Sequence, residues 1–414
     1  MTTMRMGALD MMRANNRIIS AMGPIDPPSV DEIAAAVHAL AVAGGPETRF
    51  GLLPTPDSRV WSYDPDAFLH DVVELPPCSA DDLPRILTQR ARSTAAAHPL
   101  RVAVAGDYLI VDISHGLGDA RLVNMLNQVL GERIDPARLP GWAHGRATRH
   151  PLRNAIAAFY GTQPRQAGRL MATRRGQHPI GQQSGVTVPW RREPVVVSTR
   201  SHEGTLARLR RRRDRLGACY SSASMLFAAL ADEIRCHGID LHPSTTVMFD
   251  CRRYLRHPEH VYGNFVSGVE LAIPDPGNPA HVHGAISDAA RCGRPLATVL
   301  LGAQRFWRRY RSGLAYRDAT SVARRPRAKL VFSDVGDVLA DSPMWLGDSS
   351  QRFYNAINES NDPEAIVFTI THRGPDVDIS ATFQANIFAP NVIQSALDSA
   401  VREPERHLAL KTGT

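Results

Sequence analysis

Residues 108–126 constrain the fold more than any other stretch of the chain, because three local signals follow one another there without a gap. An apolar run rich in β-branched residues leads directly into His115. Gly116 and Gly118 then allow the backbone to turn sharply. After Asp119, apolar residues recur at helical spacing. The stretch therefore predicts a strand, a tight loop and an amphipathic helix, with a histidine at the end of the strand.

His115 and Asp119 form a His-x-x-x-Asp pattern in this loop. A loop between rigid elements can hold one imidazole at a cleft, and neutral imidazole titrates in the range that a general base needs. The same pattern also fits a structural histidine in a capped turn, so its meaning depends on the rest of the chain. The two glycines partly match a dinucleotide-binding loop, but Arg121 stands where a third glycine is needed for helix packing.

Length and composition indicate a globular protein with more than one core. The chain has 414 residues, 43% hydrophobic and 21% charged, which is enough for two domains. No apolar run reaches the roughly 18 residues that a membrane span needs, and the N-terminus lacks the apolar centre of a signal peptide, so we expect a cytoplasmic protein. The five cysteines form no Cys-x-x-Cys pair, and the histidines at 281 and 283 have no acidic or cysteine partner at suitable spacing. We expect no metal site.

Strand and helix signals alternate in two halves of the chain. In the first half, helices are expected at 4–19, 29–43 and 80–94, and strands at 49–53, 60–63, 71–75, 100–105 and 108–113. In the second half, helices are expected at 205–216, 222–236, 278–292 and 391–402, and strands at 195–198, 245–249, 265–273, 329–333, 365–371 and 378–387. Apolar periodicity weakens between the halves. We expect an N-terminal half over 1–175, a crossing segment over 176–194 and a C-terminal half over 195–414.

Four motifs in order resemble those of the chloramphenicol-acetyltransferase-like superfamily. The histidine loop is followed by Phe-Asp-Cys-Arg-Arg-Tyr from Phe249, Tyr-Gly-Asn-Phe-Val from Tyr262 and Phe-Ser-Asp-Val-Gly from Phe332, before a terminal hairpin and helix. That superfamily includes condensation domains of nonribosomal peptide synthetases, plant-type acyltransferases, wax ester synthases and acyltransferases of polyketide lipids. The chain departs from the shared pattern at Ser114, where many members have a second histidine, and at Ala120, where many have glycine.

The resemblance implies an α/β fold of two pseudo-symmetric halves, each with a mostly antiparallel or mixed sheet flanked by helices, and an active site in a tunnel between them. It implies that His115 is the general base of an acyl transfer. It also implies that Asp119 pairs with Arg252 to hold the loop, because a buried bidentate pair fixes geometry without carrying a proton. Other motif positions expected around the site are Gly116, Gly118, Asn264, Ser333 and Gly336.

Arginines are concentrated at 208–215 and 305–329, and the net charge of +7 favours anionic partners. In the second cluster they alternate with aromatic residues. We expect Arg308, Arg309 and Arg311 to lie near the donor entrance, where they would meet the phosphates of coenzyme A or an acidic carrier protein. A solvated helix face and a peripheral membrane contact are the alternatives. We expect no bound cofactor and no nucleic-acid partner.

The sequence therefore predicts an acyltransferase of secondary or lipid metabolism that uses acyl-CoA or a phosphopantetheine-linked acyl donor and a small alcohol or amine acceptor. The alternative is a non-catalytic condensation-domain-like protein that recruits a carrier protein or partner enzyme through the same cleft. The presence of both His115 and Asp119 favours the enzyme.

Overall fold

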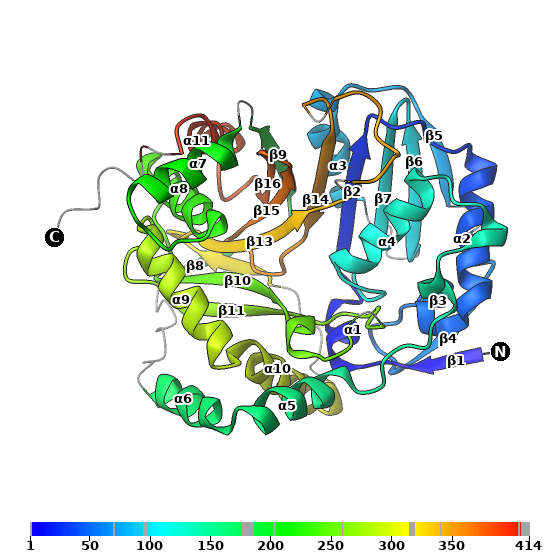
Figure 1. Ribbon diagram of the computed structural model, residues 1–414, viewed down its shortest axis with the longest axis horizontal. Coiled ribbons are helices and arrows are strands. Elements are labelled where there is room, and N and C mark those ends of the chain that lie inside the picture. Colours follow the sequence, from blue (N-terminus) through cyan, green and yellow to red (C-terminus); the bar gives the residue numbers. More distant parts are fainter. Residues whose placement is uncertain are drawn as a thin grey trace.

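Two large β-sheets divide the protein into two lobes that lie side by side (Figure 1). The computed structural model describes residues 2–68, 71–93, 98–175, 186–201, 204–258, 260–313, 319–339, 341–348, 350–404 and 406. Both sheets are mixed and carry helices on their faces, as expected for an α/β fold of two similar halves. Among the described residues, no helix combines the length and the apolar character needed to cross a bilayer.

The first sheet carries the predicted hairpin and the strand that leads to His115. Its strand order is β14 (Phe353–Asn358), β2 (Arg17–Gly23), β7 (Tyr108–Ser114), β6 (Leu100–Ala105) and β5 (Val72–Leu75). Neighbours are antiparallel except β5 and β6. Alternate residues of β2 face opposite sides: Ile18 packs in the cluster that contains α2 (Val30–Gly44) and α4 (Ala120–Gly131), and Ile19 packs with α3 (Leu83–Arg92). The sheet is thus covered on both faces.

The second sheet forms the core of the other lobe. Its strand order is β11 (Val266–Ala272), β10 (Ser244–Asp250), β13 (Lys329–Asp337), β15 (Ala365–Arg373), β16 (Asp376–Gln384) and β9 (Pro194–Arg200). β13 runs parallel to both of its neighbours, and the other pairs are antiparallel. One hydrophobic cluster joins this sheet to α7 (Thr205–Arg215), α8 (Ser222–Cys236), α9 (Pro279–Arg291) and α11 (Pro390–Arg402).

Strand β14 connects the lobes, because it comes from the second half of the sequence but pairs with β2 in the first sheet. It also lies against β15 and β16 of the second sheet. Residues 353–358 therefore lie in the first sheet although they follow residue 195, and α5 (Pro151–Thr162), which precedes residue 195, packs against η5 (Cys251–Tyr254) and α10 (Arg294–Arg311) of the second half. No strand is expected here from the sequence, since the short run of Phe, Tyr, Asn, Ala, Ile and Asn carries neither alternation nor a β-branched majority.

The expected helix at 4–19 is wrong. The chain forms β1 (Thr2–Arg5), α1 (Ala8–Arg13) and then β2, which is buried along its whole length. A strand buried on both faces has no alternation to distinguish it from a helix.

β1 pairs with β4 (Val60–Tyr63), which also pairs with β3 (Leu52–Leu53). Short 3-10 helices occur at η1 (Gly45–Thr48), η2 (Ala80–Asp82), η3 (Pro136–Arg138), η4 (Gly141–His144) and η5 (Cys251–Tyr254).

The segment between the lobes contains helices that weak periodicity concealed. These are α5 (Pro151–Thr162) and α6 (Pro164–Arg175). Most of their described side chains are exposed or half-exposed. Residues 176–185 of the expected crossing segment lie outside the described residues, and β8 (Thr187–Pro189) pairs with β12 (Ser321–Ala323). The first part of the basic aromatic stretch is the end of α10 (Arg294–Arg311), whereas Tyr316 and Arg317 lie outside the described residues.

Candidate active site

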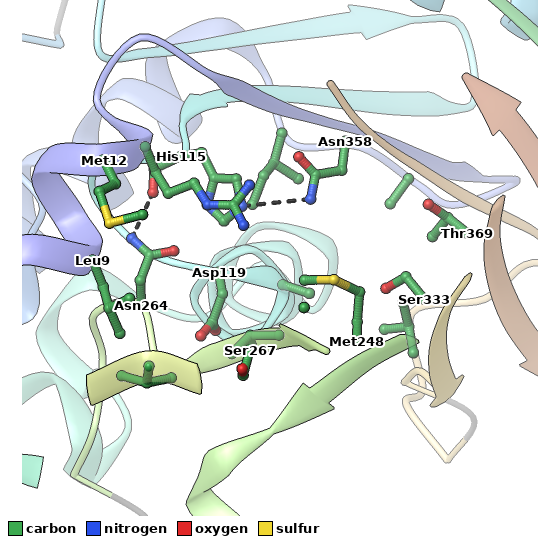
Figure 2. Close-up of a pocket in the computed structure, with 18 of the residues that line it drawn as sticks. Leu9, Met12, His115, Asp119, Met248, Asn264, Ser267, Ser333, Asn358 and Thr369 are labelled. Atoms are coloured by element: carbon green, nitrogen blue, oxygen red, sulfur yellow. Dashed lines mark hydrogen bonds between the residues drawn. The ribbon is translucent and has the colours of Figure 1, made fainter. Parts of the chain in front are cut away.

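The loop between β7 and α4 holds His115 at the junction of the lobes, as the sequence predicted (Figure 2). His115 is only 5% exposed. Its backbone N–H donates to the carbonyl of Asn16 at 2.8 Å, and its own carbonyl accepts from the side-chain amide of Asn264 at 2.7 Å. Contacts from both halves of the chain therefore fix the loop.

The hydrogen bonds of the imidazole determine which nitrogen is basic. Nδ1 of His115 lies 2.9 Å from the carbonyl oxygen of Gly118. A carbonyl oxygen can only accept, so Nδ1 carries the proton and Nε2 keeps its lone pair. Nε2 lies 3.5 Å from the side-chain nitrogen of Asn358, a long contact that a bound group can replace. The loop thus presents a neutral imidazole with its acceptor nitrogen free to take a proton.

Burial keeps this imidazole neutral. The pKa of His115 is lowered from 6.5 to about 4, mainly because burial disfavours the charged ring and secondly because the Arg13 guanidinium lies nearby. The unfolded chain takes up this proton near pH 6.5, whereas the folded chain does so only near 4. Folding stability is therefore lost through this residue as the pH falls between those two values.

The pH dependence of catalysis should reflect this shift. We expect the acid limb of kcat/KM to lie near pH 4, instead of near 6.5 for an ordinary imidazole, because kcat/KM reports the free enzyme. Rates measured from pH 8 to pH 4.5 check this, with the His115 ring titrated by NMR in the same buffers. A ring that titrates near pH 6.5 would contradict the burial argument.

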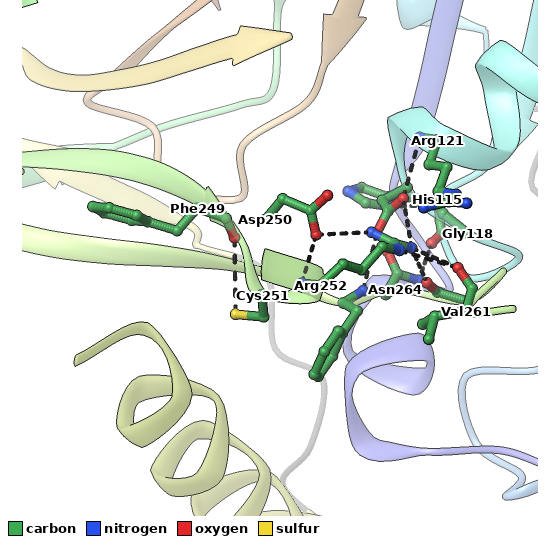
Figure 3. A network of polar contacts seen from close by, with 12 residues as sticks. His115, Gly118, Arg121, Phe249, Asp250, Cys251, Arg252, Val261 and Asn264 are labelled. Carbon is green, nitrogen blue, oxygen red and sulfur yellow. Dashed lines mark hydrogen bonds and ion pairs between the residues drawn. The ribbon is translucent and has the colours of Figure 1, made fainter. Parts of the chain in front are cut away.

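Asp119 and Arg252 form a buried ion pair that joins the two halves. Figure 3 shows Arg252 within its network of polar contacts. The two guanidinium nitrogens lie 2.9 and 3.2 Å from the two carboxylate oxygens, a bidentate arrangement. Asp119 also caps α4 by accepting from the backbone of Arg121 at 3.2 Å, and it accepts from the backbone of Phe265 at 2.9 Å. Since donors surround its carboxylate, Asp119 is suited to hold the loop and poorly placed to move protons.

Arg252 is anchored by further contacts from its own half. Its guanidinium donates to the carbonyls of Val261 and Gly263 and to Asp250, at 2.9 to 3.2 Å. The carboxylates of Asp119 and Asp250 raise the pKa of Arg252 against the effect of burial. The arginine is therefore a fixed, charged support beneath the histidine loop.

The glycines of the loop are needed for close packing. A β-carbon on Gly116 would stand 2.9 Å from both the α-carbon of Ala14 and the ring of Trp61. One on Gly118 would stand 2.7 Å from Leu122 and 2.9 Å from a backbone oxygen of Tyr262. Neither neighbourhood has room for a side chain, so Gly116 lets the loop lie close to Ala14 and Trp61 of the first half, and Gly118 lets it lie close to Tyr262 of the second half.

A cavity of about 240 Å³ opens beside His115, between the lobes (Figure 2). Two of its polar atoms, Oγ of Ser267 and Oδ1 of Asn358, are buried and make no hydrogen bond to any described residue. Buried polar atoms are normally satisfied, so these two favour an occupant with polar groups. The lining is otherwise largely apolar and includes Leu9, Met12, Ile18, Met248, Val266, Val299, Val335 and Ile357.

The other expected site residues take different places. Ser333 lines the cavity on β13, opposite Thr369 of β15. Asn264 lines it too, but its amide is bound to the histidine loop. Gly336 is not among the lining residues: it has a positive φ of 77° at an irregularity between β13 and β15, and its role is in the strand.

Arg308, Arg309 and Arg311 lie on the exposed end of α10 and not in the cavity wall. The same helix contributes Thr298 and Gly302 to that wall. Residues three, four and seven positions apart share a helix face, so Arg309 continues the face of Gly302, as does the exposed Arg305. Arg308 and Arg311 follow Gly302 by six and nine positions, which places them on other sides of the helix than Gly302.

Two residues at the cavity were missed. Asn358 ends the unpredicted strand β14, and Arg13 ends a helix that had been merged with β2. The run that precedes Asn358 carries no clear strand pattern, so no local signal identifies this residue. Arg13 carried no local signal, because only the folded chain brings it to His115.

Comparison with known proteins supports this fold. No protein-family model matches the chain, and no curated protein matches it. The solved structure of TRI3 trichothecene 15-O-acetyltransferase from Fusarium sporotrichioides matches with a TM-score of 0.64 and 10% identity, over 98% of this chain and 94% of that one. The chain therefore has the chloramphenicol-acetyltransferase-like fold.

Other proteins of this fold match as well. The first condensation domain of the calcium-dependent antibiotic synthetase has a TM-score of 0.59 and 16% identity, over 98% of this chain and 94% of that one. VibH, a condensation enzyme of nonribosomal peptide synthesis, has a TM-score of 0.54 and 12% identity, over 94% and 90%. At these identities the similarity establishes the fold, and chemistry must be argued from the site.

Proposed function

We propose that the chain is an acyltransferase that moves an acyl group from a thioester to a hydroxyl or amine, with His115 as the general base. The observation that carries this proposal is the buried neutral imidazole, with Nδ1–H held by Gly118 and the Nε2 lone pair beside a cavity. The fold shared with an acetyltransferase and condensation enzymes supports it.

The reaction follows from this geometry. Nε2 of His115 takes the proton of the acceptor while the acceptor oxygen or nitrogen attacks the thioester carbonyl carbon. The oxyanion that forms needs hydrogen-bond donors, for which the amide of Asn358 and the hydroxyl of Ser333 are candidates in the cavity wall. When the carbon–sulfur bond breaks, the imidazolium returns its proton to the leaving thiolate. The acyl group ends on the acceptor and the proton on the released thiol, without a covalent enzyme intermediate.

The donor is either acyl-CoA or an acyl group on the phosphopantetheine of a carrier protein. Both carry phosphate, and the exposed arginines at the end of α10 offer a positive surface near the cavity. Thiol release from a panel of acyl-CoA thioesters and acylated carrier proteins, with alcohol and amine acceptors present, tests the proposal. Acceptor-dependent thiol release with an acylated product supports acyl transfer. Tight carrier binding without thiol release would favour the non-catalytic alternative.

The arginines of α10 should affect donor binding according to their helix face. Replacing Arg305 and Arg309 by Gln should raise the donor KM and flatten its dependence on salt, with turnover at saturating donor little changed. Salt matters because it screens charges beyond about 8 Å at physiological ionic strength. The matched control replaces Arg308 and Arg311 by Gln, removing the same charge from other sides. Equal effects of the two double variants would contradict the assignment to one face.

A further inference from the structure

Arg13 places a positive charge in the cavity wall that no described residue neutralises. It ends α1 and lines the same cavity as His115. Its side chain is partly buried, and no hydrogen bond or ion pair joins its guanidinium to any residue that the structure describes. The guanidinium stays charged at any physiological pH.

Two acidic residues of α1 and the cavity wall already have partners. Asp10, one helical turn before Arg13, pairs with Arg49 at 3.1 Å. Asp119, which borders the cavity, is held by Arg252. With these two acids neutralised and His115 uncharged, the described wall of the cavity has a net positive charge.

Two of the most deeply buried arginines that the structure describes have acidic partners. Arg17 is paired with Asp112, and Arg373 with Asp378. Burying an unpaired charge is unfavourable, so a guanidinium in a cavity wall is best explained by an anion that enters the cavity. Arg13 has no such partner among the described residues, and it lies at the site of the proposed chemistry.

We propose that Arg13 binds a carboxylate of the substrate, so that the enzyme selects a carboxylate-bearing acceptor or acyl group. This proposal rests on the proposed acyl transfer. A carboxylate matches the guanidinium in charge and in bidentate geometry. A phosphate carries about one more negative charge, for which the largely apolar wall offers no second cation among its described residues. The carboxylate can belong to a hydroxy or amino acid acceptor, or to a dicarboxylic acyl donor.

Binding of such a substrate would also strengthen the base. Arg13 is the second cause of the lowered pKa of His115. A carboxylate on Arg13 would cancel that effect, so the pKa of His115 rises when the charged substrate is present. When the carboxylate belongs to the acceptor, a stronger base at the moment of attack favours transfer to that acceptor over hydrolysis of the donor.

Paired probes of equal shape test the binding site without turnover. Calorimetry would compare benzoate with benzamide and hexanoate with hexanamide, on the parent protein, Arg13→Gln and Arg13→Lys. We expect the parent to bind at least one carboxylate about tenfold more tightly than its amide. Arg13→Gln should lose this preference and Arg13→Lys should keep part of it. The pKa of His115, followed by NMR, should rise with carboxylate in the parent and be higher in Arg13→Gln without ligand.

The proposal is overturned if no carboxylate is preferred over its amide, including the case in which no probe binds, or if Arg13→Gln keeps the preference. Turnover measurements identify which substrate carries the carboxylate. They compare lactate with lactamide as acceptors, and succinyl-CoA with butyryl-CoA as donors. Arg13→Gln should reduce kcat/KM only for the charged member of a pair. Equal losses for charged and neutral members would assign Arg13 to the transition-state oxyanion and overturn the proposal. A carboxylate preference without thioester consumption would leave the binding site standing while the proposed function fails.

Discussion

Replacing His115 by alanine should reduce acyl transfer by about a hundredfold or more, because the acceptor then loses the group that takes its proton. The fold should persist. The neutral ring makes one side-chain hydrogen bond to Gly118 and a long contact to Asn358, whereas the loop is held by backbone bonds and by Asp119. Thiol release under saturating donor measures the loss, and thermal melting checks the fold.

Two further variants make this test specific. His115→Gln keeps a side-chain amide that can donate to the Gly118 carbonyl but provides no base, so it should be as inactive as the alanine variant. His144 is exposed on the surface, and His144→Ala should leave both rate and melting unchanged. Activity retained in His115→Gln would remove proton transfer by this residue from the mechanism.

Breaking the Asp119–Arg252 pair should destabilise the protein strongly. Removing one partner leaves the other charged and buried, which costs about 3 to 5 kcal/mol. Arg252→Ala leaves the buried Asp119 carboxylate with only the backbone amides of Arg121 and Phe265 as hydrogen-bond donors. Asp119→Ala leaves the buried Arg252 with only the exposed carboxylate of Asp250 and backbone carbonyls as partners, and it also removes the cap of α4. Urea unfolding of both variants measures the cost.

The controls separate charge from shape. Asp119→Asn keeps the size of the side chain and an oxygen for the cap, so it should lose less stability than Asp119→Ala. The Asp119→Ala and Arg252→Ala changes together should cost less than the sum of the single changes, because neither charge remains unpaired. If both single variants unfold like the parent while only turnover falls, the pair acts in the chemistry and the structural role is wrong.

The sequence predicted the histidine loop because the signals that define it are local. A β-branched strand, two glycines and an aspartate N-cap specify the turn within a few residues, and the structure forms that turn. The contact of Asp119 with Arg252 was expected only through the resemblance to a superfamily, since no spacing in one sequence indicates which distant arginine meets a given carboxylate. That contact is present.

The cavity wall could not be predicted in the same way. Arg13 and Asn358 reach His115 through the pairing of β2 with both β7 and β14, which no local pattern encodes. The basic stretch is predicted to bind the donor from its arginines and aromatic residues, without a helix phase. Helix phase separates Arg305 and Arg309 from Arg308 and Arg311, and that phase became clear only once residues of α10 were found in the cavity wall.

The position of β14 also affects the order in which the chain can fold during its synthesis. During synthesis β2 emerges early, but its partner at 353–358 is made only after most of the second lobe. Until then the edge of β2 that pairs with β14 in the finished protein is exposed, and it can pair with another chain. A fragment that ends between the lobes should therefore aggregate, and adding a peptide with the sequence of β14 should keep it in solution. The order of synthesis thus makes completion of the first lobe, and of the site at Asn358, a late event.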